Sequence, residues 1–478
     1  MTRNPITIAL CAAMALSAWP APAQEAKPAA EAQPAPAPAP SDPAALAQEV
    51  ARLRAAVEKL EAERKAAEER VDVVEVKSSD AVVVGDLPGS FRVPGTELSL
   101  RIYGFAELNW VHAFQADNSD VDYSTFAPYL PLNGTPEANR KNRDYLTART
   151  SRFGIEGGMP TRFGVLGARI EGDFNNEPRT GGSELYGSGR NVVTQQQTSS
   201  YGFRIRHAYG QFAGLLAGMT WSTFMDVDNF PETLDYNGPI GATFIRQPQI
   251  RFAYPTLKAG TFTAALENSS TYALDGQGNV VATSLSRMPD LVLRWDRGFE
   301  WGAVSLRAVT QDLHVSDGAG VEAAARGYGA AASISYKFRD VDFFALQVTG
   351  GHGIGRYLNY VEGAFFDADG RRMLVEDAVG AVAGYQLKAT PWVRVNLVYG
   401  VTHSFDSDYT DFARANGLTD VRFVATNRWV HQVHFGPIFT PIKAVDMGVE
   451  AIWAQRTTVG GTKGDDTRLN FSAKYYIN

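Results

Sequence analysis

The side chains of this chain that are best suited to bind a charged ligand are cations within short segments of alternating apolar and polar residues. A β-strand places successive side chains on opposite faces, so a period of two separates an apolar face from a polar one. We take the apolar face of each segment as the outer face, which points ten cations to the inside: Arg101, Arg169, Arg204, Arg206, Arg251, Arg294, Arg307, Arg394, Arg428 and Lys474. An interior of this kind attracts anions, and guanidinium groups bind carboxylates through paired hydrogen bonds.

Each of these arginines also has a structural interpretation, because it could pair with an acid on the same inner face. Glu107, Glu171, Asp173 and Glu450 are the nearest candidates. The formal net charge of −7 does not argue against an anion-attracting interior. Selectivity is set by the local field at the narrowest point rather than by the total charge.

About sixteen alternating segments follow one another from Leu98 to Ile477 and would carry these cations. The last of them runs from Arg468 to Asn478, and its apolar residues occupy every second position. Alternation with a period of two residues, which is typical of β-strands, is therefore the dominant pattern of this part of the chain. It predicts an all-β fold of about sixteen antiparallel strands.

The apolar faces point to a closed transmembrane barrel rather than a soluble sandwich. They repeatedly end in aromatic residues, as the interface girdles of membrane barrels do, and no helical pattern interrupts the strands. These aromatic residues are Trp110, Phe174, Trp295, Tyr399, Trp429, Trp453 and Tyr475. A spanning helix needs about 20 consecutive apolar residues, and no stretch after the first 23 residues approaches that length. The mean hydropathy of −0.19 agrees with a barrel, because only alternate residues face lipid.

The first 23 residues have the features of a secretory signal peptide. Arg3 precedes an apolar stretch over residues 6–19, and the sequence Ala-Pro-Ala at 21–23 is a cleavage signal. The single cysteine, Cys11, lies inside this segment, and Leu10 is too large for the residue before a lipidated cysteine. The mature chain is therefore expected to reach the bacterial outer membrane without a thiol or a disulfide.

Two segments separate the signal peptide from the barrel, which is expected over residues 98–478. Residues 24–43 form an Ala/Pro-rich linker, and residues 77–97 form a connector. Between them, residues 44–76 are predicted to form a coiled-coil helix, with one solvated amphipathic helix as the alternative. Its seam has alternating steps of four and three residues: Leu46, Val50, Leu53, Val57, Leu60, Arg64, Ala67, Val71 and Val74. Valine and leucine in alternation favour a two-stranded coiled coil, unless the number of barrels that are joined overrides this preference.

The connections between the strands alternate in length, which orients the barrel. Long polar connections lie at residues 115–144, 175–200, 222–243, 269–287, 353–375 and 406–419. The short connections include residues 158–161, 255–257, 339–341, 389–391 and 440–442. Outer-membrane barrels have their short turns on the periplasmic side and their long loops outside. The N-terminal coiled coil is therefore predicted to lie in the periplasm.

Several motifs of the chain resemble the DcaP-like porins. The motifs are residues 85–96 with Tyr103-Gly104-Phe105, Ser151-Arg152-Phe153-Gly154, Phe224-Met225-Asp226, residues 231–235, Arg246-Gln247-Pro248-Gln249 and residues 353–357. The resemblance covers the mature chain, coiled coil included. It implies a homotrimeric, sixteen-stranded channel in outer-membrane lipid that passes small negatively charged solutes, dicarboxylates in particular. One departure is the end of the chain, Tyr476-Ile477-Asn478, where such barrels usually end on phenylalanine.

The connection from Ser222 to Thr243 carries both acids and apolar residues. In sixteen-stranded channels the loop at this position folds inward and narrows the pore. Its acids, Asp226, Asp228, Glu232 and Asp235, would then face the arginines across the channel. A purely extracellular loop would have less reason to carry so many apolar residues.

Other chemistry finds little support in the sequence. His431 and His434 lie on opposite faces of one strand, which argues against a shared metal site. Residues 117–122 and 367–370 resemble fragments of calcium loops but lack the spacing that follows, and Gly353-Ile354-Gly355 lies outside any strand-to-helix unit. No Ser, His and acid set predicts an enzyme, and no cofactor is expected. A nucleic-acid partner is not expected either, because no basic cluster lies outside the predicted interior.

Two functions from different classes remain. The first is a porin that lets small anions, dicarboxylates among them, diffuse through an arginine-lined constriction. The second is an envelope-linking protein that couples the outer membrane to the periplasmic cell wall through its coiled coil. The predicted arginine lining favours the channel, since a tether would need only a plugged or featureless interior.

Overall fold

A computed structural model describes residues 43–79, 83–115, 126–175, 202–271, 273–281, 286–316, 318–338, 341–358, 363–420 and 426–477. The chain divides into two compact units, residues 1–78 and residues 79–478. The predicted signal peptide and almost all of the predicted linker lie outside the described residues.

The second unit is a closed barrel of sixteen antiparallel strands, which confirms the barrel part of the predicted fold class. Its main sheet has nineteen segments, of which β1 (Val83–Val84) and β2 (Phe91–Arg92) lie outside the ring, and β4 and β5 form one interrupted strand beside β3. The ring closes where β21 pairs with β3, from Arg468 opposite Ala113 to Ile477 opposite Gly104. Closure leaves no unpaired strand edge in the membrane.

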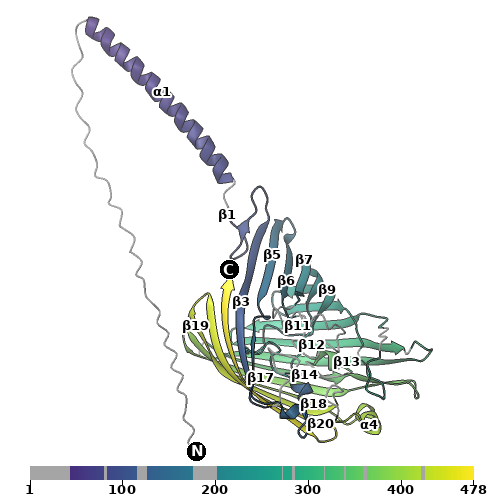
Figure 1. Ribbon diagram of the computed structural model, residues 1–478. Helices are drawn as coiled ribbons and strands as arrows, with labels where there is room; N and C mark the ends of the chain where they lie inside the picture. Colours follow the sequence, from purple (N-terminus) through teal and green to yellow (C-terminus); the bar gives the residue numbers. More distant parts are fainter. Residues whose placement is uncertain are drawn as a thin grey trace, which may run out of the picture. The chain divides into compact units, whose positions relative to one another are not determined.

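The strands of the ring follow in chain order, and each pairs with the next (Figure 1). They are β3 (Ser99–Ala113), β4 (Arg143–Thr147) with β5 (Arg152–Thr161), β6 (Gly164–Asp173), β7 (Arg204–Phe212), β8 (Leu215–Trp221), β9 (Arg246–Thr256), β10 (Gly260–Glu267), β11 (Asp290–Phe299), β12 (Gly302–Ser316), β13 (Glu322–Phe338), β14 (Asp342–His352), β17 (Asp377–Thr390), β18 (Val393–Ser404), β19 (Asn427–Ile442), β20 (Val445–Thr458) and β21 (Lys463–Ile477).

The alternation along each strand places apolar side chains outside and polar ones inside. On β21, Tyr475 is 57% exposed and Ile477 is 48% exposed, whereas Asn470 and Arg468 are buried. Successive side chains of a strand point to opposite faces, and the outer face of a membrane barrel meets lipid. Burial in this barrel therefore marks the polar inner face.

The short connections are tighter than the sequence suggested, because several strands continue through their prolines. Residues 158–161 belong to β5, and the turn to β6 lies at residues 162–163. Residues 440–442 belong to β19, where Pro441 lies at a register shift between Phe439 and Ile442. Proline is tolerated in a sheet at such irregularities, since it has no N–H to donate to the ladder.

The opposite end of the barrel carries folded structure within the long connections. The helix α4 (Asp408–Ala415) lies there (Figure 1). The hairpin of β15 (Ala364–Asp367) and β16 (Arg372–Val375) packs against it. Phe365, Leu374 and Tyr409 form a buried apolar cluster with Leu274 of another connection. The sequence predicted no helix after residue 98, and α4 is a short exception that depends on contacts between loops.

The first unit contains the helix α1 (Pro43–Ser79). Val50, Leu53, Val57 and Leu60, which lie on the predicted seam, are all exposed. The coiled-coil association of this helix stays a prediction. Among the described residues, no helix has an apolar stretch long enough to cross a bilayer.

Candidate functional site

The connection between β8 and β9, residues 222–245, runs along the inside of the barrel; we call it the inward loop. Arg307 of β12 donates to the Phe224 carbonyl at 3.1 Å, and Gln347 of β14 donates to the Asn229 carbonyl at 2.9 Å. Further along, the Glu450 carboxylate of β20 accepts from the backbone N–H of Asp235 at 3.0 Å. The loop therefore contacts the inner wall on several strands that are remote from its own ends.

Glycines allow the backbone of the inward loop to touch the barrel wall. Gly241 has φ +94°, and a Cβ there would collide with the carbonyls of Ala381 on β17 and Val401 on β18. A Cβ on Gly400 of β18 would likewise collide with the Ile240 carbonyl. Only glycine permits both the backbone conformation and the close approach at Gly241.

Two other connections pack against the inward loop inside the barrel. The short helix η1 (Ala127–Tyr129) and Leu130 form a buried cluster with Ile240. The segment around η3 (Gly355–Tyr357) buries Ile354 and Tyr357 against Phe224. Because these clusters also include inward residues of β10 to β13, β17, β19 and β20, the loops cover that side of the interior.

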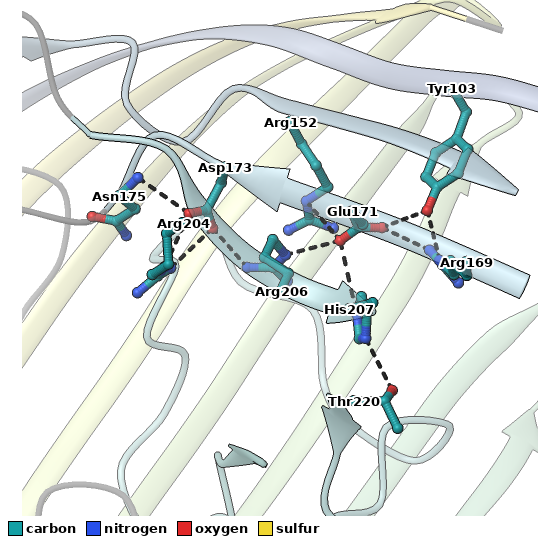
Figure 2. A network of polar contacts seen from close by, with 10 residues as sticks. All are labelled: Tyr103, Arg152, Arg169, Glu171, Asp173, Asn175, Arg204, Arg206, His207 and Thr220. Atoms are coloured by element: carbon teal, nitrogen blue, oxygen red, sulfur yellow. Dashed lines mark hydrogen bonds and ion pairs between the residues drawn. The ribbon is translucent and has the colours of Figure 1, made fainter. Parts of the chain in front are cut away.

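The remaining side carries a cluster of arginines around two buried acids of β6 (Figure 2). Glu171 accepts from Arg169 at 2.7 Å and from Arg206 at 2.9 Å, and it lies 3.4 Å from Arg152. Asp173 accepts from both Arg204 and Arg206 at 2.9 Å. Buried charges of this kind persist only when paired and hydrogen-bonded.

Neutral side chains complete this cluster. Tyr103 donates to Glu171 at 2.8 Å and accepts from Arg169 Nε at 2.6 Å. His207 Nδ1 lies 2.9 Å from the Thr220 hydroxyl (Figure 2). These contacts hold the two acids and their arginines in fixed positions along β3, β6, β7 and β8.

Two arginines of β9 differ from the rest. In the described part of the chain, the side chains of Arg246 and Arg251 make no hydrogen bond and no ion pair. Arg246 stacks over the Trp221 ring at 4.6 Å, and its Nη1 is buried without a partner. Arg251 lines a cavity of about 310 Å³ together with Arg294 and Asp228. Both guanidinium groups keep donors for an external acceptor.

The predicted acids of the inward loop have different surroundings. Asp226 lies 3.3 Å from Arg294, which also binds Asp296 at 2.7 Å. Glu232 lies 2.7 Å from Arg394, which also binds Asp446 at 2.9 Å. Asp228 is exposed, and Asp235 is buried and accepts from the Asn237 N–H at 2.9 Å.

The ten predicted cations all lie on the strand face opposite the exposed apolar side chains. Nine of them have polar partners, and Arg251 is the exception. Besides the pairs already described, Arg101 lies 2.5 Å from Glu156, Lys474 lies 3.6 Å from Glu107, and Arg307 also donates to the Ser333 hydroxyl.

Arg428 lies where β19 begins and binds a loop residue rather than a barrel acid. It lies 2.5 Å from Asp406, which also accepts from Arg414 at 2.6 Å. Hydrogen bonds from Arg428 and Arg414 hold the pKa of the Asp406 carboxyl well below its usual range.

Sequence reasoning missed several inner-face arginines. Arg152 and Arg246 are the first residues of β5 and β9. No strand residue precedes them, so the alternation of apolar and polar residues does not extend far enough to assign them to a face. Arg356 lies in the helix η3, outside any strand period, and donates to the side-chain Oε1 of Gln247 at 2.5 Å. Arg468 was visible on the polar face of β21 but was not singled out, although it is buried and binds Asp466 at 2.7 Å.

Comparison with known proteins agrees with the motifs of the sequence. The model of the DcaP outer membrane protein family matches residues 93–477. The chain belongs to this family. The predicted family is thereby confirmed, and this DcaP family member is an outer-membrane porin-type channel protein. No curated protein sequence matches the chain.

One solved structure shows the same barrel fold, and a second is similar at a lower score. The crystal structure of the outer membrane channel DcaP of Acinetobacter baumannii has a TM-score of 0.64 at 23% identity, covering 83% of this chain and 100% of that one. The anion-selective porin from Comamonas acidovorans has a TM-score of 0.45 at 15% identity, covering 80% of this chain and 100% of that one.

Proposed function

We propose that this DcaP family porin lets small anions, dicarboxylates among them, diffuse along the side of the interior that the described parts of the loops leave uncovered. The supporting observation is the charge balance of that side. Five arginines from β5, β6, β7 and β9 surround two carboxylates, those of Glu171 and Asp173; we call them the arginine wall: Arg152, Arg169, Arg204, Arg206 and Arg246.

The unpaired arginines of β9 supply the contacts for a passing anion. A guanidinium without an acceptor gains a charge-assisted hydrogen bond from a passing carboxylate. The Arg246 side chain is partly exposed and makes no hydrogen bond among the described residues, so it can supply such a donor. Arg251 lies five residues further along β9, toward the short-turn end, so it offers a second contact. Each contact gives a modest net gain, which keeps release easy and suits passage rather than storage.

The paired arginines have a different proposed role. Arg294 and Arg394 bind Asp226 and Glu232 of the inward loop, so they attach the loop to the wall. Their charges are partly cancelled, and they shape the opening more than they attract solutes. Together with Arg251, the other predicted cations stay proposed pore-lining residues, and the four loop acids stay proposed constriction residues.

A planar-bilayer recording in asymmetric KCl tests the anion preference. The Arg246→Gln/Arg251→Gln double variant should shift the reversal potential toward zero, because two cations without acid partners are removed. Arg162→Gln is the matched control, since Arg162 is exposed in the turn between β5 and β6. An unchanged reversal potential in the double variant would show that these arginines do not set the selectivity.

The dicarboxylate preference needs its own measurement. Succinate should reduce the single-channel current of the unmodified protein more than a neutral sugar of similar size does. The double variant should weaken the succinate effect and leave the sugar effect unchanged, because guanidinium binds carboxylates through charge-assisted hydrogen bonds. Equal effects of succinate and sugar on the unmodified protein would contradict the proposal.

We further propose that the chain is a homotrimer whose α1 helices associate in the periplasm. The supporting observation is that two leucines of the predicted heptad seam, Leu53 and Leu60, are 57% and 63% exposed, so their apolar side chains are available to a second helix. Light scattering of the detergent-solubilised protein should give three chains per particle. The link to the cell wall stays a prediction of the sequence alone.

A further inference from the structure

A cavity of about 320 Å³ lies between the arginine wall and the inward loop. Cationic side chains line it from the barrel side, and aromatic rings line it from the side of the loop. Its volume is in the range of small-ligand sites, which runs from about 300 to 1,000 Å³. The two kinds of lining suit a ligand with a charged end and a flat apolar body.

Three cations line this cavity, and two of them, Arg152 and Lys474, have unused hydrogen-bond donors, whereas Arg206 binds Glu171 and Asp173. Arg152 lies 3.4 Å from Glu171, and Lys474 lies 3.6 Å from Glu107. Neither side chain makes a hydrogen bond within the described residues. The Nε of Arg152 is buried and is the atom nearest Glu171, so the Nη atoms are the donors that remain for a ligand. Their side chains are 22% and 20% exposed, so a solute in the cavity can reach them.

The acids that also line the cavity are engaged elsewhere. The Glu232 carboxylate accepts from Arg394 at 2.7 and 2.8 Å and from Gln386 at 2.8 Å. Asp235 is buried and accepts from the Asn237 N–H. The donors of Arg152 and Lys474 therefore remain the strongest polar groups that the cavity offers to an anion.

The opposite lining is a group of half-buried aromatic rings. The rings of Trp221 and Phe244 are 5.0 Å apart, and those of Phe230 and Phe244 are 6.1 Å apart. The ring of Tyr236 lies 5.7 Å from the Lys474 ammonium. Aromatic pairs at such separations are favourable in offset or edge-on arrangements, so a further flat ring would find a partner here.

We propose that this cavity binds small monoanions with an aromatic body, of the chemical class of benzoate. The carboxylate takes the donors of Arg152 and Lys474, and the ring lies against Phe244 and its neighbours. The proposal rests on the proposed anion channel and names a further class of solute for it. The ring contact should strengthen binding about two- to tenfold over an aliphatic carboxylate, the size of one aromatic pair.

Current block in planar bilayers tests this site with the full-length protein. Benzoate, propanoate and neutral benzamide are added in turn to the unmodified channel at 0.1 M KCl. Benzoate should block at a concentration about two- to tenfold lower than propanoate. Benzamide should block less than either anion, because it lacks the charge that Arg152 and Lys474 bind.

Two variants separate the ring contact from the charge contact. Phe244→Leu should reduce the preference for benzoate over propanoate to near unity, while Phe262→Leu, on the outer face of β10, should keep it. Lys474→Gln should weaken block by both anions and keep their ratio. If Phe244→Leu does not insert, Lys474→Gln alone still tests the charged end of the site.

The outcomes distinguish this inference from the proposed function. Equal block by benzoate and propanoate, in a channel whose reversal potential still favours anions, would overturn the aromatic site alone. A reversal potential without anion preference would overturn the anion channel itself. A benzoate preference that persists in Phe244→Leu, or block that is unchanged in Lys474→Gln, would place the binding outside this cavity and overturn the inference.

Discussion

The two sides of the barrel interior use the same residue type in different ways. On the side that the loops cover, Arg294 and Arg394 each bind two carboxylates, one of which belongs to the inward loop. On the arginine wall, four guanidinium groups share two carboxylates, and the fifth, that of Arg246, has no ion pair among the described residues. An arginine of a barrel is thus a structural or a solute-binding residue according to the acids near it. The predictions below test this difference, from the largest expected effect to the smallest.

Glu171→Gln should have the largest effect on stability. Glu171 is 1% exposed and compensates Arg169, Arg206 and Arg152. Its neutralisation leaves Arg152 and Arg169 without a carboxylate and Arg206 with Asp173 alone, which costs about 3–5 kcal/mol. Urea unfolding of the detergent-refolded barrel, followed by tryptophan fluorescence, should show a lower midpoint. Glu300→Gln, at an exposed position between β11 and β12, is the matched control and should leave the midpoint unchanged.

Arg394→Gln and Arg251→Gln compare the two classes of arginine directly. Loss of Arg394 leaves Glu232 and Asp446 without their common partner, so the free energy of unfolding should fall by about 2 kcal/mol, less than for a fully buried pair. Arg251 has no ion pair in the described structure, so its loss should change the free energy of unfolding by about 0.5 kcal/mol or less. Equal destabilisation by both variants would contradict the distinction.

Gly400→Val should displace the inward loop without altering a charge. The added side chain meets the Ile240 carbonyl, so the loop must move away from β18. We expect a higher single-channel conductance, because the loop narrows the interior. Gly298→Val is the control, since a Cβ at Gly298 meets no atom within 4 Å. A conductance equal to that of the control would show that the loop does not limit the flow.

Salt should produce the smallest of these effects. The Debye length falls from about 10 Å at 0.1 M to about 3 Å at 1 M, so the anion preference of the unmodified channel should decline as KCl is raised. The Arg246→Gln/Arg251→Gln variant should show a weaker decline, because less of the field remains to be screened. Reversal potentials at a fixed concentration ratio and increasing mean salt measure both slopes. Parallel slopes would indicate that other charges carry the preference.

The sequence by itself determined the barrel and its inner face. The period of two in segments such as Arg468 to Asn478 separates the faces of a strand, and the outward face meets lipid wherever the strand lies in the ring. This local rule is sufficient because the barrel is closed in the membrane, so every strand has lipid on its outer face and the polar interior on its inner face. The family, too, was visible in short motifs and is confirmed over residues 93–477.

Only the tertiary structure decided which arginines are compensated. The partner of Arg394 is Glu232, 162 residues earlier in the chain, and Glu450 binds the backbone of Asp235 across the interior. Such pairs depend on the path of the inward loop. Gly241 and Gly400 permit that path because they let two backbones come close, and no periodic pattern in the sequence marks these contacts. Strand period specifies the direction of a side chain, whereas the local field depends on distances between segments that closure of the barrel brings together.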